Sequence, residues 1–155
     1  MKNRELYSKV IIRSVEHIFK QFLGDDSIEE VFDTQSNDES TIVVVEIDGM
    51  LRGEVVITLP TTTLDEITKH LLKKEKSTKK HHADVAGEIV NMITGTFANQ
   101  MQFVKYELIL SPPVFDDDPI AMKALYENVN LSFSSRFGGF DVDLYYKEKV
   151  KEYND

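Results

Sequence analysis

Residues 41–59, TIVVVEIDGMLRGEVVITL, decide the fold of this chain. Two runs rich in branched residues, 41–47 and 51–59, flank Asp48-Gly49, and this pattern predicts a β-hairpin because Asp-Gly suits the tight turn between antiparallel strands. Pro60 ends the second strand, because proline has no N–H to donate to a strand ladder. We therefore expect an antiparallel sheet that contains this hairpin.

Helical patterns lie on both sides of the hairpin. Before it, Asn3 is a candidate cap for a helix that Gly24 would end, and after it Thr63 and Glu66 form a capping box for a second helix that runs to about Lys74. The first helix carries an apolar stripe made of Val10, Ile11, Val15, Ile18, Phe19 and Phe22. Both helices are expected to pack on the sheet.

Further strands follow from branched and aromatic runs. Residues 27–34 predict an edge strand, and 104–110 predict a strand before two prolines. Residues 130–137 and 140–146 bracket Gly138-Gly139 as a second hairpin. Residues 116–128 fit a loop, a short helix or a strand equally well.

Helices and antiparallel pairs in this order predict an α+β fold, an antiparallel sheet with helices packed on one face. The length of 155 residues and the hydrophobic content of 41% suit one core, so we expect a single domain over 1–155, with 146–155 as a frayed tail. The N-terminus carries charges throughout its apolar stretch, unlike a signal peptide, and no run approaches the ~20 apolar residues of a membrane span. A soluble protein is expected.

Charge and cysteine content limit the possible partners. Twenty-seven acidic against 18 basic residues give a net charge of −9, which argues against a general nucleic-acid binder and leaves proteins or small molecules as partners. The chain has no cysteine, so it has neither disulfides nor a thiolate metal site, and a cytoplasmic location is compatible with this.

Residues 84–101, DVAGEIVNMITGTFANQM, predict a third helix with two unlike faces. At 100° per residue, one half of the wheel is apolar and should face the core: Val85, Ala86, Ile89, Val90, Met92, Ile93, Phe97 and Met101. Gln100 breaks the pattern on that side. The other half holds one charge, two amides and small residues, namely Gly87, Glu88, Asn91, Gly95, Ala98 and Asn99.

Two interpretations of this second half remain open. Its glycines each cost the helix roughly 1 kcal/mol relative to alanine, so local helix stability does not explain them. Small residues around Glu88 and Asn91 suit a docking surface that a partner's backbone approaches closely. Alternatively, a neighbouring element of the chain covers the face, with Gly95 making room for it and Asn91 capping a loop.

The motif Asp84-x-x-Gly87-Glu88-x-x-Asn91-Met92-Ile93-x-Gly95, with Ala98, resembles the signature helix of the CheC/CheX/FliY phosphatases of bacterial chemotaxis. The resemblance extends to the late hairpin, where Leu131-x-Phe133 and Gly139-Phe140-x-Val142-x-Leu144 look like the closing strands of that family. CheC and many FliY domains carry two copies of the helix. The single copy here favours the CheX branch.

This resemblance implies an aspartyl-phosphate phosphatase that acts on phosphorylated CheY-type response regulators. Asn91 would orient the attacking water, and Glu88 would pair with the regulator's lysine. The small or polar positions would let the regulator approach, as partner-binding residues: Gly87, Gly95, Ala98 and Asn99. The chain needs no cofactor or metal of its own, since the magnesium belongs to the bound regulator. The family also implies a homodimer joined at sheet edges.

Other functional classes fit less well. A catalytically silent module of the same fold would bind a response regulator or a flagellar switch component through this helix, and a purely structural dimerisation domain would use neither Glu88 nor Asn91. No nucleophile elbow or phosphate-binding glycine loop is present. Adjacent His81 and His82 with Asp84 lack the usual spacing of metal ligands.

Five lysines gather just before the third helix: Lys73, Lys74, Lys76, Lys79 and Lys80. They either steer an acidic partner towards the helix or form part of a mobile, solvated linker. The sequence leaves both interpretations open.

Overall fold

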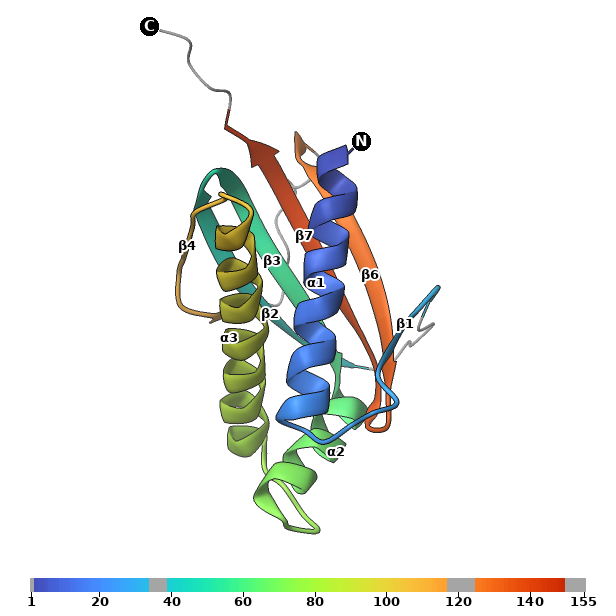
Figure 1. Ribbon diagram of the computed structural model, residues 1–155. Helices are drawn as coiled ribbons and strands as arrows, with labels where there is room; N and C mark the ends of the chain where they lie inside the picture. Colours follow the sequence, from blue (N-terminus) through green and yellow to red (C-terminus); the bar gives the residue numbers. More distant parts are fainter. Residues whose placement is uncertain (1, 34–38, 117–124, 150–155) are drawn as a thin grey trace, which may run out of the picture.

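The computed structural model describes residues 2–33, 39–116 and 125–149. Its helices and strands alternate irregularly along the chain (Figure 1). In chain order they are α1 (Lys2–Gln21), β1 (Glu29–Val31), β2 (Ser40–Gly49), β3 (Leu51–Pro60), α2 (Thr61–Leu72), α3 (Lys79–Phe103), β4 (Leu108–Leu110), β5 (Val114–Phe115), β6 (Glu127–Ser135) and β7 (Gly138–Glu148).

The strands form one antiparallel sheet in the order β1-β6-β7-β3-β2-β4, with β5 also paired to β2. The predicted first hairpin is confirmed, since β2 pairs with β3 from Ser40↔Pro60 to Ile47↔Gly53. The second hairpin, β6–β7, joins the first through pairing of β7 with β3. Two local hairpins thus become one sheet through a single long-range strand pair.

Helices α1 and α3 lie side by side on one face of this sheet, and α2 lies at one end of it (Figure 1). Alternate residues of β2 point into the layer between the sheet and the helices, where Val43, Val45 and Ile47 are buried. Tyr7 of α1 is fully buried there and meets Tyr146 of β7 edge-on, with ring centroids 5.0 Å apart. The predicted α+β architecture, with helices on one sheet face, is confirmed.

The caps expected for the first two helices are wrong. Asn3 lies inside α1, and its Nδ2 donates to Glu148 Oε2 of β7 at 2.8 Å. Helix α2 begins at Thr61, so its N-cap is Pro60, which has no polar side chain. Thr63 lies inside the helix, and its hydroxyl donates to the carbonyl oxygen of Gly139 at 2.8 Å. In both cases a contact with a distant strand replaces the local one.

The second hairpin turns two residues earlier than expected. Its turn is Arg136-Phe137, whereas Gly138 already belongs to β7 with φ +132°. A Cβ on Gly138 would collide with Thr63 Oγ1, so this glycine allows α2 and the hairpin to approach closely.

Several element ends also differ from expectation. Helix α3 begins at Lys79 and continues to Phe103, so the strand predicted over 104–110 is reduced to Leu108–Leu110. The described part of the edge strand predicted over 27–34 is Glu29–Val31, and residue 34 lies outside the described residues. Most of the undecided stretch 116–128 and residues 150–155 of the expected tail also lie outside them, but β7 includes residues 146–148.

Asp25 connects the loop after α1 to the second hairpin. Its side chain is 1% exposed and accepts hydrogen bonds from Ser27 N at 2.9 Å, Ser27 Oγ at 2.6 Å and Arg136 N at 3.0 Å. Burial alone would raise the pKa of Asp25, but these hydrogen bonds outweigh it and lower the pKa below its ordinary value. The ionised carboxylate therefore stabilises the fold.

We expect Asp25→Ala to lower the free energy of unfolding at pH 7 by about 1–3 kcal/mol, because it removes the charged acceptor of three hydrogen bonds and leaves the part-buried N–H groups of Ser27 and Arg136 without it. Since the folded pKa is lowered, the difference from wild type should be full above about pH 4 and shrink as the pH falls through the folded value. Denaturant unfolding at several pH values measures it. The exposed Asp26→Ala is the control, and a pH-independent difference would contradict the role of the charge.

Candidate functional site

Helix α3 presents its apolar half to the core, as the sequence predicts. Buried in it are Val85, Ala86, Ile89, Val90, Ile93, Thr94, Phe97 and Met101. Of the residues expected on this face, only Met92 is partly exposed, and it still packs against the core. Sequence reasoning missed Thr94, whose hydroxyl donates to the carbonyl of Val90 at 2.8 Å and so needs no partner outside the helix.

The opposite half of α3 faces away from the core. Glu88, Asn91 and Asn99 are exposed, and Gly87, Gly95 and Ala98 are half-buried. Glu88 and Asn91 are three residues apart, so they are neighbours on one helix face, with Cβ atoms about 5–6 Å apart. Within the described part of the chain, neither side chain makes a hydrogen bond or an ion pair.

The two glycines of this face lie in open space. A Cβ built on Gly87 or on Gly95 meets nothing within 4 Å. The interpretation in which a neighbouring element covers the face, with Gly95 making room for it, is therefore wrong for the described residues. Nothing in this part of the chain accounts for two helix-weakening residues on one exposed face.

The start of α3 is held to α2 by a polar cluster that sequence reasoning missed. Asp65 accepts hydrogen bonds from Ser77 Oγ and from His82 Nε2, the latter at 3.1 Å, and pairs with Lys69 Nζ at 2.9 Å. The Ser77 bond, then the Lys69 bond, lower the pKa of Asp65 to about 2. Thr78 caps the helix by accepting from the N–H of His81 at 3.2 Å.

Serine, histidine and aspartate in one cluster suggest a nucleophilic triad, but the geometry excludes it. Ser77 Oγ and Asp65 Oδ1 both contact the same ring nitrogen, His82 Nε2, at 2.7 and 3.1 Å. In a triad, serine and aspartate contact opposite ring nitrogens of the histidine. One nitrogen then takes the proton of the serine, while the N–H of the other donates to the aspartate. We assign the cluster a structural role in fixing the start of α3.

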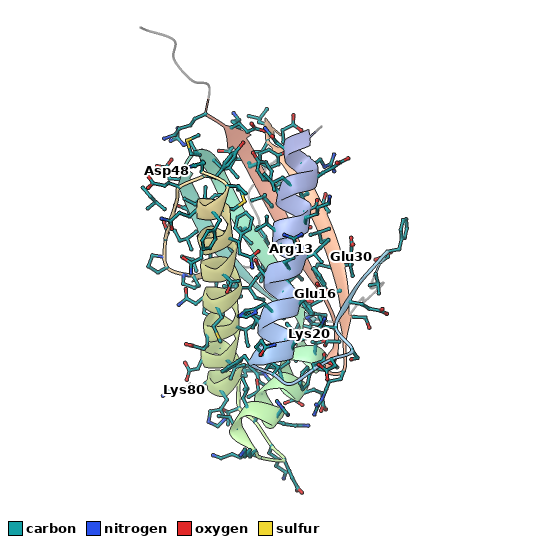
Figure 2. The ribbon with its side chains drawn as sticks, in the orientation of Figure 1. Arg13, Glu16, Lys20, Glu30, Asp48 and Lys80 are labelled. Carbon is teal, nitrogen blue, oxygen red and sulfur yellow. The ribbon has the colours of Figure 1, made fainter. Side chains whose placement is uncertain are left out.

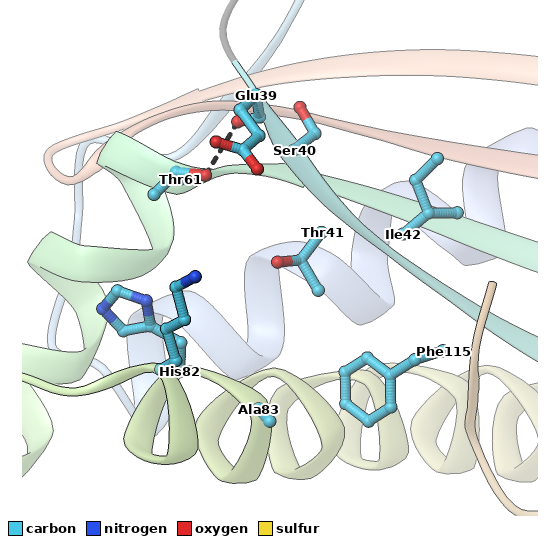
Figure 3. A pocket seen from close by; sticks show the side chains of 9 residues that line it. Glu39, Ser40, Thr41, Ile42, Thr61, His82, Ala83 and Phe115 are labelled. Carbon is cyan, nitrogen blue, oxygen red and sulfur yellow. Dashed lines mark hydrogen bonds between the residues drawn. The ribbon is translucent and has the colours of Figure 1, made fainter. Parts of the chain in front are cut away.

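A pocket opens between the first turns of α3 and strand β2, and Figure 3 shows His82, Ala83 and Phe115 around it. At its upper rim Thr61 Oγ1 donates to the carbonyl of Glu39 at 2.9 Å. Over residues 2–33, 39–116 and 125–149, no group of three or more acidic or histidine side chains is placed to hold a metal. Ser40, Thr41 and Lys79 also line the pocket.

The family model described as chemotaxis phosphatase CheX matches residues 41–129, more than half of the chain. The chain belongs to the CheX family. The matched range includes the central hairpin, α2 and the whole of α3, so Glu88 and Asn91 lie within it. No curated protein matches the sequence.

Solved structures share the CheX-family fold over almost the whole chain. The structure of a CheX–CheY–BeF3–Mg²⁺ complex from Borrelia burgdorferi matches with a TM-score of 0.75 and 18% identity, covering 92% of this chain and 98% of that one. Chemotaxis protein CheX from Vibrio vulnificus has a TM-score of 0.74 and 18% identity, covering 93% and 98%. A CheC-like protein from Shewanella sp. PV-4 has a TM-score of 0.71 and 20% identity, covering 91% and 97%.

No helix in the described ranges is long and apolar enough to cross a membrane.

We expect Gly87→Ala and Gly95→Ala each to raise the free energy of unfolding by about 0.5–1 kcal/mol. Alanine is the better helix former, and the structure leaves space for its methyl group at both positions. Denaturant unfolding of each variant measures the change. Gly138→Ala is the matched control, since its Cβ would meet Thr63 and should destabilise the protein. Destabilisation by Gly87→Ala or Gly95→Ala would mean that the face is not open.

Proposed function

We propose that this chain is a phosphatase of a phosphorylated CheY-type response regulator, which it binds with the exposed half of α3. One observation carries the proposal: Glu88 and Asn91 lie exposed and one turn apart, without partners among the described residues, between two glycines in open space. Membership of the CheX family supports it, and a relative of the same fold forms a complex with CheY.

Asn91 is the residue we assign to the attacking water. Hydrolysis of an aspartyl phosphate needs a water in line with the bond that breaks, and a carboxamide can both accept from that water and donate to the phosphoryl group. The carboxamide is not consumed in the reaction. Because Asn91 is exposed and unpaired within the described chain, no internal bond must break before it reaches the regulator.

Glu88 is the residue we assign to the lysine in the regulator's phosphorylation site. Its carboxylate would make a charge-assisted hydrogen bond there and so fix the register of the two proteins. With that contact made, the helical spacing places Asn91 one turn further along the same face. Asp84 lies one turn before Glu88 and is exposed as well, so the face is acidic at this point.

Gly87, Gly95, Ala98 and Asn99 complete the surface that we assign to partner binding. Because these four residues have short side chains or none, the backbone of α3 can approach a narrow phosphorylation site around Glu88 and Asn91. The magnesium needed to neutralise the phosphoryl oxygens would be that of the bound regulator, and the chain would contribute no cofactor. Such an enzyme works where its regulator is, so we place it in the cytoplasm.

A homodimer joined at sheet edges is also part of this proposal. Strand β1 pairs only with Ser132–Ser134 of β6, so within the described chain residues 127–131 of β6 have no strand on that side. Unpaired backbone groups at such an edge are a template for another strand. Light scattering at several concentrations gives the oligomeric state.

We expect Asn91→Ala to lower the kcat for phosphate release from the phosphorylated regulator by about 100-fold, with little change in affinity, because the water loses its orientation. Glu88→Ala should weaken both binding and turnover, lowering kcat/KM by roughly 10–100-fold through the lost charged contact. The assay measures phosphate released by catalytic amounts of protein, and Gln21→Ala, an exposed carboxamide on α1, is the control.

Wild-type rates in both variants would exclude these roles. Binding of the regulator by wild-type protein without faster phosphate release would identify the chain as a silent docking module instead.

Gly95→Ala should act in opposite directions on stability and function. The methyl group has space in the free protein, but it would stand between α3 and the docked regulator. We expect kcat/KM to fall about 10-fold or more, as for a positional error of a fraction of an ångström, while stability rises. Full activity in a stabilised Gly95→Ala variant would show that the regulator does not approach α3 at this point.

A further inference from the structure

The lysine cluster (Lys73, Lys74, Lys76, Lys79 and Lys80) sets one end of the molecule apart electrostatically. All five side chains are exposed, and Glu75 is the one acidic residue among residues 73–80. The chain as a whole has 27 acidic and 18 basic residues. The stretch 73–80 is therefore net positive in a protein whose net charge is −9.

Three lysines of this cluster lie at helix ends, and Lys74 and Lys76 lie in the segment between α2 and α3. Lys73 is the C-cap of α2 with φ 54°, and its backbone N–H donates to the carbonyl of Lys69. Lys79 and Lys80 form the first turn of α3, directly after the cap at Thr78. Figure 2 shows Lys80 at the end of α3 that lies next to α2.

The stability of helix α3 does not account for Lys79 and Lys80. A helix N-terminus carries a partial positive charge, and each cation placed there is unfavourable by about 0.3–1 kcal/mol. The first turn of α3 contains no acidic residue to offset Lys79 and Lys80. No acidic side chain of the described chain forms an ion pair with any of the five lysines.

The cluster is continuous with the surface proposed above for the regulator. Lys80, Asp84, Glu88 and Asn91 follow one another at spacings of four, four and three residues, so they lie in one row along the exposed half of α3. At 1.5 Å per residue, Lys80 is about 12 Å from Glu88 along the helix axis. A domain that covers Glu88 and Asn91 would therefore extend over Lys80.

We propose that the lysine cluster is a second contact surface for the response regulator. The lysines recognise acidic side chains of the regulator that lie beside the regulator's phosphorylated aspartate. This inference rests on the proposed function. Carboxylates that hold magnesium lie at the phosphorylation site of such a regulator, so acidic side chains are available there to Lys79 and Lys80, while Glu88 faces the regulator's lysine. Nucleic acid is the other polyanion that fits lysines, but a net charge of −9 disfavours it.

The cluster changes the rate of association with the regulator, because exposed charges steer the encounter of two proteins. Added salt screens this attraction. Lys79 and Lys80 raise the rate at which the regulator docks and do not take part in the chemical step. The association rate constant and kcat/KM should therefore depend on these lysines and on salt, while kcat depends on neither.

The test compares the double variant Lys79→Gln/Lys80→Gln with the double variant Lys9→Gln/Arg13→Gln. The second is the control, because it also removes two positive charges, from exposed positions on α1. Stopped-flow association with a beryllofluoride-activated CheY-type regulator is measured from about 20 mM to 500 mM salt, together with phosphate release. We expect the first pair to slow association about 5–10-fold at low salt and to match wild type at high salt. The control pair should slow it less than 2-fold.

A slower association of the first pair should not result from unfolding, because removing cations from the start of α3 should stabilise the helix. The free energy of unfolding, measured by denaturation, tests this. Equal association of wild type and the first pair at low salt overturns the inference, while loss of activity in Asn91→Ala still supports the proposed function. Equal losses in both pairs mean a general charge effect and also overturn it. Wild-type protein that binds DNA but not the regulator overturns both proposals.

Discussion

Packing of the apolar half of α3 against the sheet determines which of its side chains remain free for a partner. The helix buries Ile89, Val90, Ile93 and Phe97 in the layer that it shares with α1 and the central hairpin. With this half fixed, the 3.6-residue period turns Glu88 and Asn91 outwards. The polar cluster around Asp65 fixes the start of the helix, so its rotation and position are both set before any partner arrives.

On the exposed side of α3, local stability and the proposed function conflict. Two glycines in open space and two lysines at the N-terminus all weaken the helix. A helix selected only for stability would carry alanine in place of the two glycines, and acidic residues in place of the two lysines at its N-terminus. The proposed contact with a response regulator would account for all four departures. The buried half compensates for them through its packing.

The sequence predicted the features that depend on local composition, turn residues and periodicity. The two branched runs in 41–59 around Asp48-Gly49 indicated the hairpin, and the period of 84–101 separated the core residues of α3 from Glu88 and Asn91. It did not predict contacts between distant segments. Thr63 has the signature of a helix cap but bonds to Gly139, which follows it by 76 residues. The Asp65–Ser77–His82 cluster has no local signature either, because α2 and α3 form it only when they pack.

The most direct measurement is the crystal structure of this chain bound to a beryllofluoride-activated CheY-type regulator with magnesium. We expect α3 to cover the phosphorylation site, with the Asn91 carboxamide about 3 Å from the beryllofluoride or from a water in line with it. Glu88 should contact the regulator's lysine in the same structure. A complex in which the regulator sits on another surface, and Glu88 and Asn91 remain open to solvent, would contradict the proposed function.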